Sequence, residues 1–298
     1  MTASKVNVGF VGLGIMGLPM ATHIYAAGYP LRVFSRTRSK AQSLLSRGTE
    51  WRESAADVAA DCDVFITCVT DTPEVEALLF GPRGAAESLP SGAIVVDMST
   101  IRPDAACEFA QRLAERGVAM LDAPVTGGEV GARNATLTIM VGGDPAAFQR
   151  VLPLLQTMGK KVAHVGPSGA GQSLKACNQI LCAVNMIGVC EALQLARAAG
   201  LDLHQAIDTL AAGAGGSWAW STLGAKIVAG DLKPAFMIRL IQKDLRIVQD
   251  AADASHLPMP GTALAQQLFR AVEASAGGAE LGTQAMIRAY ECLIGRDA

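Results

Sequence analysis

The segment "VNVGFVGLGIMGLPMATHIYAAG" constrains the fold more than any other part of the chain, because it places glycines between an apolar run and a helical pattern. Gly12, Gly14 and Gly17 have the spacing G-x-G-x-x-G. Glycine at these positions permits a tight turn, a close approach of the backbone to a ligand, and close packing of a helix on a strand. The segment therefore predicts a strand, a sharp turn and a helix.

The rest of the N-terminal half continues this alternation up to about residue 166. Short β-rich runs occur at 6–11, 31–34, 64–69, 93–97, 119–121, 137–141 and 161–165. Helical segments separate them, as in a parallel sheet built from βαβ units. After Gly166 the β signal disappears, and helical patterns follow at 172–199, 203–212, 218–229, 240–254, 261–275 and 284–294. We therefore predict an α/β protein with a Rossmann domain over residues 1–166. An all-α domain for substrate binding and oligomerisation follows over 167–298, and the long helix after residue 171 joins the two.

Composition and charge exclude several classes of function. The 298 residues carry a net charge of -2, and the basic residues are scattered, which argues against a nucleic-acid partner. The seven cysteines form no CxxC pair and no cluster with histidine, so we expect a reduced compartment and no metal site. The N-terminus lacks the layout of a signal peptide, and the charge-free stretch 176–190 is shorter than the ~20 residues of a membrane span. We expect a cytoplasmic protein without a membrane partner.

The glycine turn is typical of dinucleotide-binding folds, in which the first amides of the following helix face the phosphates. A plain glycine-rich turn is the alternative. If a dinucleotide binds, the predicted contacts in this loop are Gly12, Gly14, Ile15, Met16 and Gly17.

The residues after the second strand indicate which dinucleotide binds. NAD-binding folds usually carry an acid there, whereas this chain reads "LRVFSRTRSK", with Ser35, Arg36 and Thr37 in its place. An arginine and hydroxyl groups favour a 2'-phosphate. The sequence thus predicts NADP(H), with NAD(H) possible; solvated surface arginines are the alternative.

Two later segments carry small polar groups at strand ends. Ser99 and Thr100 follow a strand in "VVDMSTIRPDAA", at the edge where ligands of open α/β folds bind, although a helix N-cap would use the same residue types. In "LDAPVTGGEVGARNATLTIMVGGD", Thr126, Gly127 and Gly128 combine a hydroxyl with consecutive backbone amides, which suits a carboxylate. A structural glycine-rich turn is the alternative explanation for these residues.

Lys175 lies in the apolar stretch "GAGQSLKACNQILCAVN". On a helix, Asn178 and Gln179 share its face. A buried lysine beside neutral amides titrates easily and can exchange a proton with a ligand. The alternative is a lysine whose stem packs on the helix while its amine reaches solvent.

Taken together, these segments resemble the β-hydroxyacid dehydrogenase family, which includes 3-hydroxyisobutyrate dehydrogenases and tartronate semialdehyde (2-hydroxy-3-oxopropionate) reductases. The matching motifs are "GFVGLGIMGLPMA", "DMST", "DAPVTGGEVGA", "TLTIMVGG", "GAGQSLKACNQ" and "FMIRLIQKDL". The resemblance implies that Lys175 is the catalytic lysine and that Thr126, Gly127 and Gly128 hold the substrate carboxylate. It also implies that Asn178 and Gln179 contact the substrate, and Gln179 is similar to the residue of the tartronate semialdehyde reductases.

The resemblance also bears on the cofactor and on substrate choice. Thr100 and Lys243 match cofactor-contacting positions, and Val69 and Thr70 are further predicted contacts. Two segments depart from the family: Ala135 replaces a usual glycine, and "LGTQAM" replaces an Asp-x-Ser-Ala pattern.

The implied activity is NADP(H)-dependent interconversion of a small 3-hydroxy acid and its semialdehyde, in a homodimer or homotetramer. Tartronate semialdehyde is the first candidate substrate. The alternatives are 3-hydroxyisobutyrate, succinic semialdehyde, glyoxylate and serine. An imine reductase and a catalytically silent NADP-binding interaction module are the rival functions.

Overall fold

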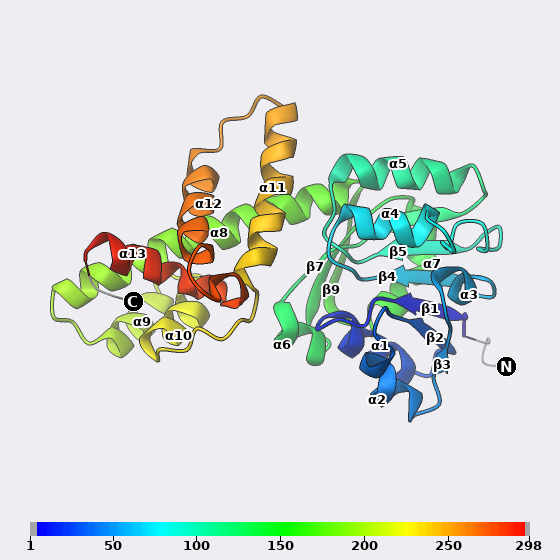
Figure 1. Cartoon of the computed structure of the whole chain (residues 1–298), viewed down its shortest axis with the longest axis horizontal. Coiled ribbons are helices and arrows are strands. Elements are labelled where there is room, and N and C mark those ends of the chain that lie inside the picture. Colours follow the sequence, from blue (N-terminus) through cyan, green and yellow to red (C-terminus); the bar gives the residue numbers. More distant parts are fainter. Residues whose placement is uncertain (1–4, 296–298) are drawn as a thin grey trace. The chain divides into compact units, whose positions relative to one another are not determined.

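The computed structural model describes residues 5–295, and the chain forms two compact units, one ending at Lys175 and the other beginning at Ala176. The predicted boundary at 166/167 coincides with the end of the last strand, whereas the two units separate within the long helix that follows it. Figure 1 shows an α/β first unit and a helical second unit.

The first unit contains one nine-stranded sheet with the order β3-β2-β1-β4-β5-β6-β8-β7, and β9 pairs with β8. The strands are β1 (Val8–Val11), β2 (Leu31–Phe34), β3 (Glu50–Trp51), β4 (Val64–Thr67), β5 (Ile94–Asp97), β6 (Ala119–Asp122), β7 (Val125–Thr126), β8 (Leu137–Gly142) and β9 (Gly159–Gly166). Strands β1 to β6 are parallel to one another. The sheet is not parallel throughout, because β8 runs antiparallel to β6 and β7.

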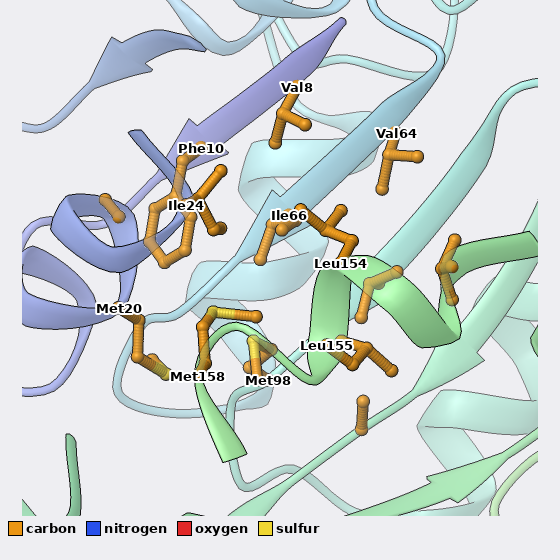
Figure 2. Packing of buried hydrophobic residues seen from close by; sticks show 14 of the residues in the cluster. Val8, Phe10, Met20, Ile24, Val64, Ile66, Met98, Leu154, Leu155 and Met158 are labelled. Carbon is orange, nitrogen blue, oxygen red and sulfur yellow. The ribbon is translucent and has the colours of Figure 1, made fainter. Parts of the chain in front are cut away.

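Helices cover both faces of this sheet. They are α1 (Gly17–Ala26), η1 (Arg38–Ala41), α2 (Gln42–Leu45), α3 (Ala55–Ala59), α4 (Thr72–Phe80), α5 (Pro103–Ala114), α6 (Gly128–Arg133) and α7 (Pro145–Leu155). Alternate side chains of β1 enter different cores: Phe10 packs with α1 and α7, whereas Val11 packs with α3, α4 and α5. Figure 2 shows the first core, where Phe10 and Ile66 from the sheet meet Ile24 of α1 and Leu154 of α7. The helices bury both faces of the sheet, and the carboxyl ends of its strands are where ligands of such folds bind.

The second unit is helical, as the sequence predicts. Its elements are α9 (Leu203–Ala211), the π-helical turn η2 (Ala219–Gly224), α10 (Ala225–Val228), α11 (Ile238–Ala254), α12 (Pro260–Glu273), η3 (Gly278–Glu280), η4 (Thr283–Met286) and α13 (Ile287–Leu293). The helix α8 (Ala170–Ala198) joins the units. Met186 and Leu193 of α8, Ile241 and Leu245 of α11 and Phe269 of α12 share one buried core. The predicted fold class is therefore confirmed.

Helix α8 also bears on the expectation about membranes. Among residues 5–295 it is the one helix whose length and mean hydropathy of 1.5 would suit a membrane span. The core helix of a water-soluble protein passes the same test, and α8 supplies Ala183, Met186, Val189, Cys190 and Leu193 to the buried core.

Candidate functional site

The glycine turn between β1 and α1 has the close packing that its spacing predicts. A side chain at Gly17 would overlap the carbonyl oxygen of Gly12, and one at Gly12 would collide with the carbonyl oxygen of Cys68. Gly14 faces open space, and among residues 5–295 no side chain makes a capping hydrogen bond at the N-terminus of α1. Ile15 is exposed and Met16 half-buried in the same turn. The first amides of α1 can therefore receive phosphate oxygens, as a dinucleotide requires.

The end of β2 presents the three residues predicted to select the cofactor. Ser35 is half-buried, and Arg36 and Thr37 are exposed. Arg38, which follows them, is held by Glu53 at 3.2 Å and lies 5.2 Å from the centre of the Trp51 ring. Within the described residues Arg36 has no comparable ion pair with a carboxylate, so its guanidinium can bind an anion.

The ends of β4 and β5 are tied together by hydrogen bonds. The Thr67 hydroxyl donates to Asp97 Oδ1 at 2.7 Å, and the Val69 amide donates to Ser99 Oγ at 2.9 Å. Ser99 therefore links two strand ends and does not cap the following helix, whose N-cap is Arg102. Thr70 is exposed and Thr100 half-buried beside them. The strand order places these loops next to the glycine turn, since β4 lies between β1 and β5.

The predicted carboxylate anchor lies where β7 joins the short helix α6. Thr126 is half-buried and ends β7, and Gly127 and Gly128 have φ values of 128° and 62°. These are conformations that only glycine adopts readily. In the described part of the chain no side chain makes a capping hydrogen bond to α6, so the amides of this turn are not covered by a side chain of the turn itself. The geometry fits a hydrogen-bonded carboxylate and equally a structural turn.

Lys175 lies in the second turn of α8 and is 6% exposed. Such burial does not fit a lysine whose amine extends into solvent. Asn178 is half-buried and Gln179 is 2% exposed, on the same helix face. The Asn178 amide nitrogen donates to Gln179 Oε1 at 2.7 Å. The predicted proton donor and the two amides are thus adjacent on one helix.

Gln179 is also engaged by a carboxylate that sequence reasoning did not single out. Its amide nitrogen donates to Asp244 Oδ2 at 2.5 Å, and Asp244 Oδ1 pairs with Lys243 Nζ at 2.7 Å. Lys243 and Asp244 belong to α11 and are 8% and 3% exposed. The signal was present in the motif "FMIRLIQKDL", where an acid follows the lysine. Asp244 therefore orients both a predicted substrate contact and a predicted cofactor contact.

Asp122 and Gln172 are two further buried groups that sequence reasoning did not select. Burial raises the pKa of Asp122 to about 6, the amides of Gly169 and Gln172 oppose this shift, and the neighbouring Asp97 adds to it. Asp122 ends β6 directly before the "APVTGG" segment. Its position at the end of a predicted strand is the sequence feature from which it could have been selected.

The structure thus brings most predicted cofactor residues to the carboxyl edge of one sheet, at the ends of β1, β2, β4 and β5. Lys175 lies in the same compact unit, and Asn178, Gln179 and Lys243 lie in the second unit. Within residues 5–295, no group of three or more histidine, cysteine or acidic side chains could hold a metal ion.

Comparison with known protein families identifies both halves of the chain. Residues 7–166 match the NAD-binding domain of 6-phosphogluconate dehydrogenase. Residues 169–290 match the family described as NAD-binding of NADP-dependent 3-hydroxyisobutyrate dehydrogenase. Both matches agree with a nicotinamide dinucleotide as the cofactor.

Individual relatives cover nearly the full length. The chain is 41% identical to 2-hydroxy-3-oxopropionate reductase from Escherichia coli, over 97% of this chain and 98% of the relative. It is 40% identical to NAD-dependent L-serine dehydrogenase from Pseudomonas aeruginosa, over 89% of this chain and 91% of the relative. A solved structure of Mycobacterium tuberculosis 3-hydroxyisobutyrate dehydrogenase with L-serine matches with a TM-score of 0.88 and 31% identity, over 96% of this chain and 99% of that one. The chain therefore belongs to the β-hydroxyacid dehydrogenase family, as a nicotinamide-dinucleotide-dependent oxidoreductase of small hydroxy acids.

Proposed function

We propose that the protein interconverts a small 3-hydroxy acid and its semialdehyde with NADP(H), and that tartronate semialdehyde is its preferred substrate. The observation that carries the proposal is the buried Lys175 beside Asn178 and Gln179 on α8. The 41% identity to 2-hydroxy-3-oxopropionate reductase supports the substrate. The alternatives within the same chemistry are 3-hydroxyisobutyrate, succinic semialdehyde and glyoxylate.

Each group of predicted site residues has a separate role in the proposed reaction. When bound, the nicotinamide cofactor would supply the hydride for reduction, or accept it in oxidation, at the carbon that bears the oxygen. Lys175 donates a proton to the carbonyl oxygen in reduction and assists its removal from the hydroxyl in oxidation. Thr126, Gly127 and Gly128 hold the carboxylate, and Asn178 orients the substrate and Lys175.

Gln179 contributes a second substrate contact. Its amide nitrogen carries two hydrogens, and one of them forms the bond to Asp244. The other hydrogen can be donated to the substrate. Asp244 holds Lys243 through its other oxygen, so Lys243 has a fixed orientation for its cofactor contact.

The proton donor is tested by Lys175→Ala, with the exposed Lys161 changed to alanine as the matched control. Turnover in the Lys175 variant should fall at least ~100-fold, the low end for general acid-base catalysis, while NADPH still binds. The Lys161 variant should keep normal turnover. Near-normal turnover of Lys175→Ala would refute the assignment.

The cofactor preference is tested at Arg36. A charge-assisted hydrogen bond contributes about 1.5–3 kcal/mol, so Arg36→Ala should lower kcat/KM for NADPH at least ~10-fold and leave that for NADH nearly unchanged. Arg38, which Glu53 and Trp51 hold, is the control position. Equal or better use of NADH by the unaltered enzyme would overturn the NADP(H) proposal.

L-Serine oxidation is the second candidate, because one relative is an NAD-dependent L-serine dehydrogenase and one structural neighbour contains L-serine. A panel of semialdehydes, glyoxylate, 3-hydroxyisobutyrate and serine, assayed with both cofactors, separates the two. The highest kcat/KM on serine with NAD would replace the leading proposal.

We also propose a cytoplasmic homodimer or homotetramer. Leu181 and Leu195 on α8 are 63% and 73% exposed, and burying them in an assembly would be favourable. The seven cysteines are free thiols, as expected in a reducing compartment. Light scattering after size-exclusion chromatography measures the assembly, and a monomer would refute that part.

A further inference from the structure

The start of α8 is fastened to the sheet by the Asp122 carboxylate. Asp122 ends β6 and is 2% exposed. Its Oδ1 accepts from the Gly169 amide and its Oδ2 from the Gln172 amide, each at 2.8 Å. Amides at a helix N-terminus lack a partner within the helix, and a carboxylate satisfies them strongly because it is charged. Both carboxylate oxygens of Asp122 thus accept hydrogen bonds from the segment at the start of α8.

A second connection comes from the side chain of Gln172, which is 1% exposed. Its amide nitrogen donates to the carbonyl oxygen of Ser99 at 2.8 Å, and its Oε1 accepts from the Ile101 amide at 3.1 Å. The Ser99 hydroxyl in turn accepts from the Val69 amide. The first turn of α8 is therefore joined to the two loops that carry the predicted cofactor contacts Val69 and Thr100.

The packing at this junction leaves no room for a side chain. A Cβ atom at Gly171 would lie 2.5 Å from the carbonyl oxygen of Met140 and 2.6 Å from that of Asp122. A Cβ atom at Gly142 would lie 2.8 Å from the Gly171 amide nitrogen. The helix therefore touches the sheet backbone directly, and its position can vary little.

Lys175 follows Gln172 by three residues, which corresponds to about 4.5 Å of rise and the same helix face. We propose that Asp122 and Gln172 are positioning residues that fix the first turn of α8 on the ends of β5 and β6 and thereby hold Lys175 at the reacting oxygen. This inference rests on the proposed role of Lys175. It matters because a proton donor acts over ~3 Å, and a displacement of about 1 Å can cost ~100-fold in rate.

The test uses Asp122→Asn and Gln172→Leu in the full-length enzyme, each alone and combined with Lys175→Ala. Asp122→Asn replaces one carboxylate oxygen by an NH2 group, which cannot accept the hydrogen bond from a backbone amide. Gln172→Leu removes both hydrogen bonds of the Gln172 side chain and keeps a side chain of similar size. Each single change should lower kcat at least ~10-fold at pH 8 and alter the NADPH Kd less than ~2-fold. In the Lys175→Ala background neither change should lower kcat further, because residues that act through one group are not additive.

Asp144→Asn is the matched control. Asp144 caps α7 by accepting from the Ala147 amide at 2.7 Å, so the same substitution is made at a helix start of the same unit, and kcat should stay unchanged. If Asp122→Asn does not fold, Gln172→Leu carries the test.

Two results would overturn the inference: an unchanged kcat in the folded single variants, or an equal fold-loss with and without Lys175. Normal turnover of Lys175→Ala by itself is a different result. It refutes the proposed proton donor, and the positioning role falls with it.

Discussion

Asp122 should make the unfolding free energy depend on pH in a direction opposite to that of most acidic residues. Burial raises its pKa to about 6 from an ordinary value of 3.8, so between these values the folded state binds more protons than the unfolded state. Stability from this group is therefore greatest below pH 4 and is lost as the pH rises through about 6. Asp122→Asn removes the titrating group and hence this dependence.

The magnitude follows from the two pKa values. Linkage between pH 7 and pH 4.5, with pKa values of about 6 folded and 3.8 unfolded, amounts to about 2 kcal/mol. The wild type should therefore gain about 2 kcal/mol over Asp122→Asn across this interval.

Urea unfolding of both proteins at pH 4.5, 5.5, 6.5 and 7 measures this difference. Asp144→Asn serves as control, because it removes an exposed helix-capping aspartate on α7 and should not give a gain of this sign. A difference between wild type and Asp122→Asn that is constant with pH, or that grows toward pH 7, would show that burial does not raise the pKa of the Asp122 carboxyl group.

Three further substitutions test local features of the structure. Ala135 has a φ of 53°, so Ala135→Gly should relieve left-handed strain of ~1–2 kcal/mol. The larger entropy loss of glycine on folding offsets part of this gain. The melting temperature should therefore rise by a few degrees, and a lower melting temperature would refute this expectation. Gly17→Ala places a methyl group against the Gly12 carbonyl and should weaken NADPH binding at least ~10-fold, as titration would show. Phe269 is fully buried in the second unit, and Phe269→Ala should cost about 3–5 kcal/mol in denaturant unfolding.

Local sequence patterns predicted the strands and helices where a period or a turn residue was present. The seven predicted strands correspond to β1, β2, β4, β5, β6, β8 and β9, and the helix predicted over 172–199 is Ala170–Ala198. Two-residue strands such as β3 and β7 are too short to show alternation, so no pattern could reveal them. The antiparallel pairing of β8 depends on how distant segments meet, which periodicity does not encode.

The unusual residue Ala135 shows where sequence and structure complement each other. The sequence marks it as a departure from the usual glycine, but only the backbone explains why glycine is usual there: the φ of 53° falls in the left-handed region. By contrast, nothing in the structure explains the replacement of the Asp-x-Ser-Ala pattern by "LGTQAM".

The sequence by itself determined the glycine turn, the basic loop after the second strand and the lysine with its neighbouring amides, because each depends on residue types at short fixed spacing. The tertiary structure alone decided that Asp122 and Gln172 hold the start of α8 and that Asp244 joins Gln179 to Lys243. The partners at the start of α8 are separated by 47 to 73 residues, and Gln179 and Asp244 by 65. Such contacts form because buried polar groups must find hydrogen-bond partners once the chain has folded, and a one-dimensional pattern does not specify which partners will be near.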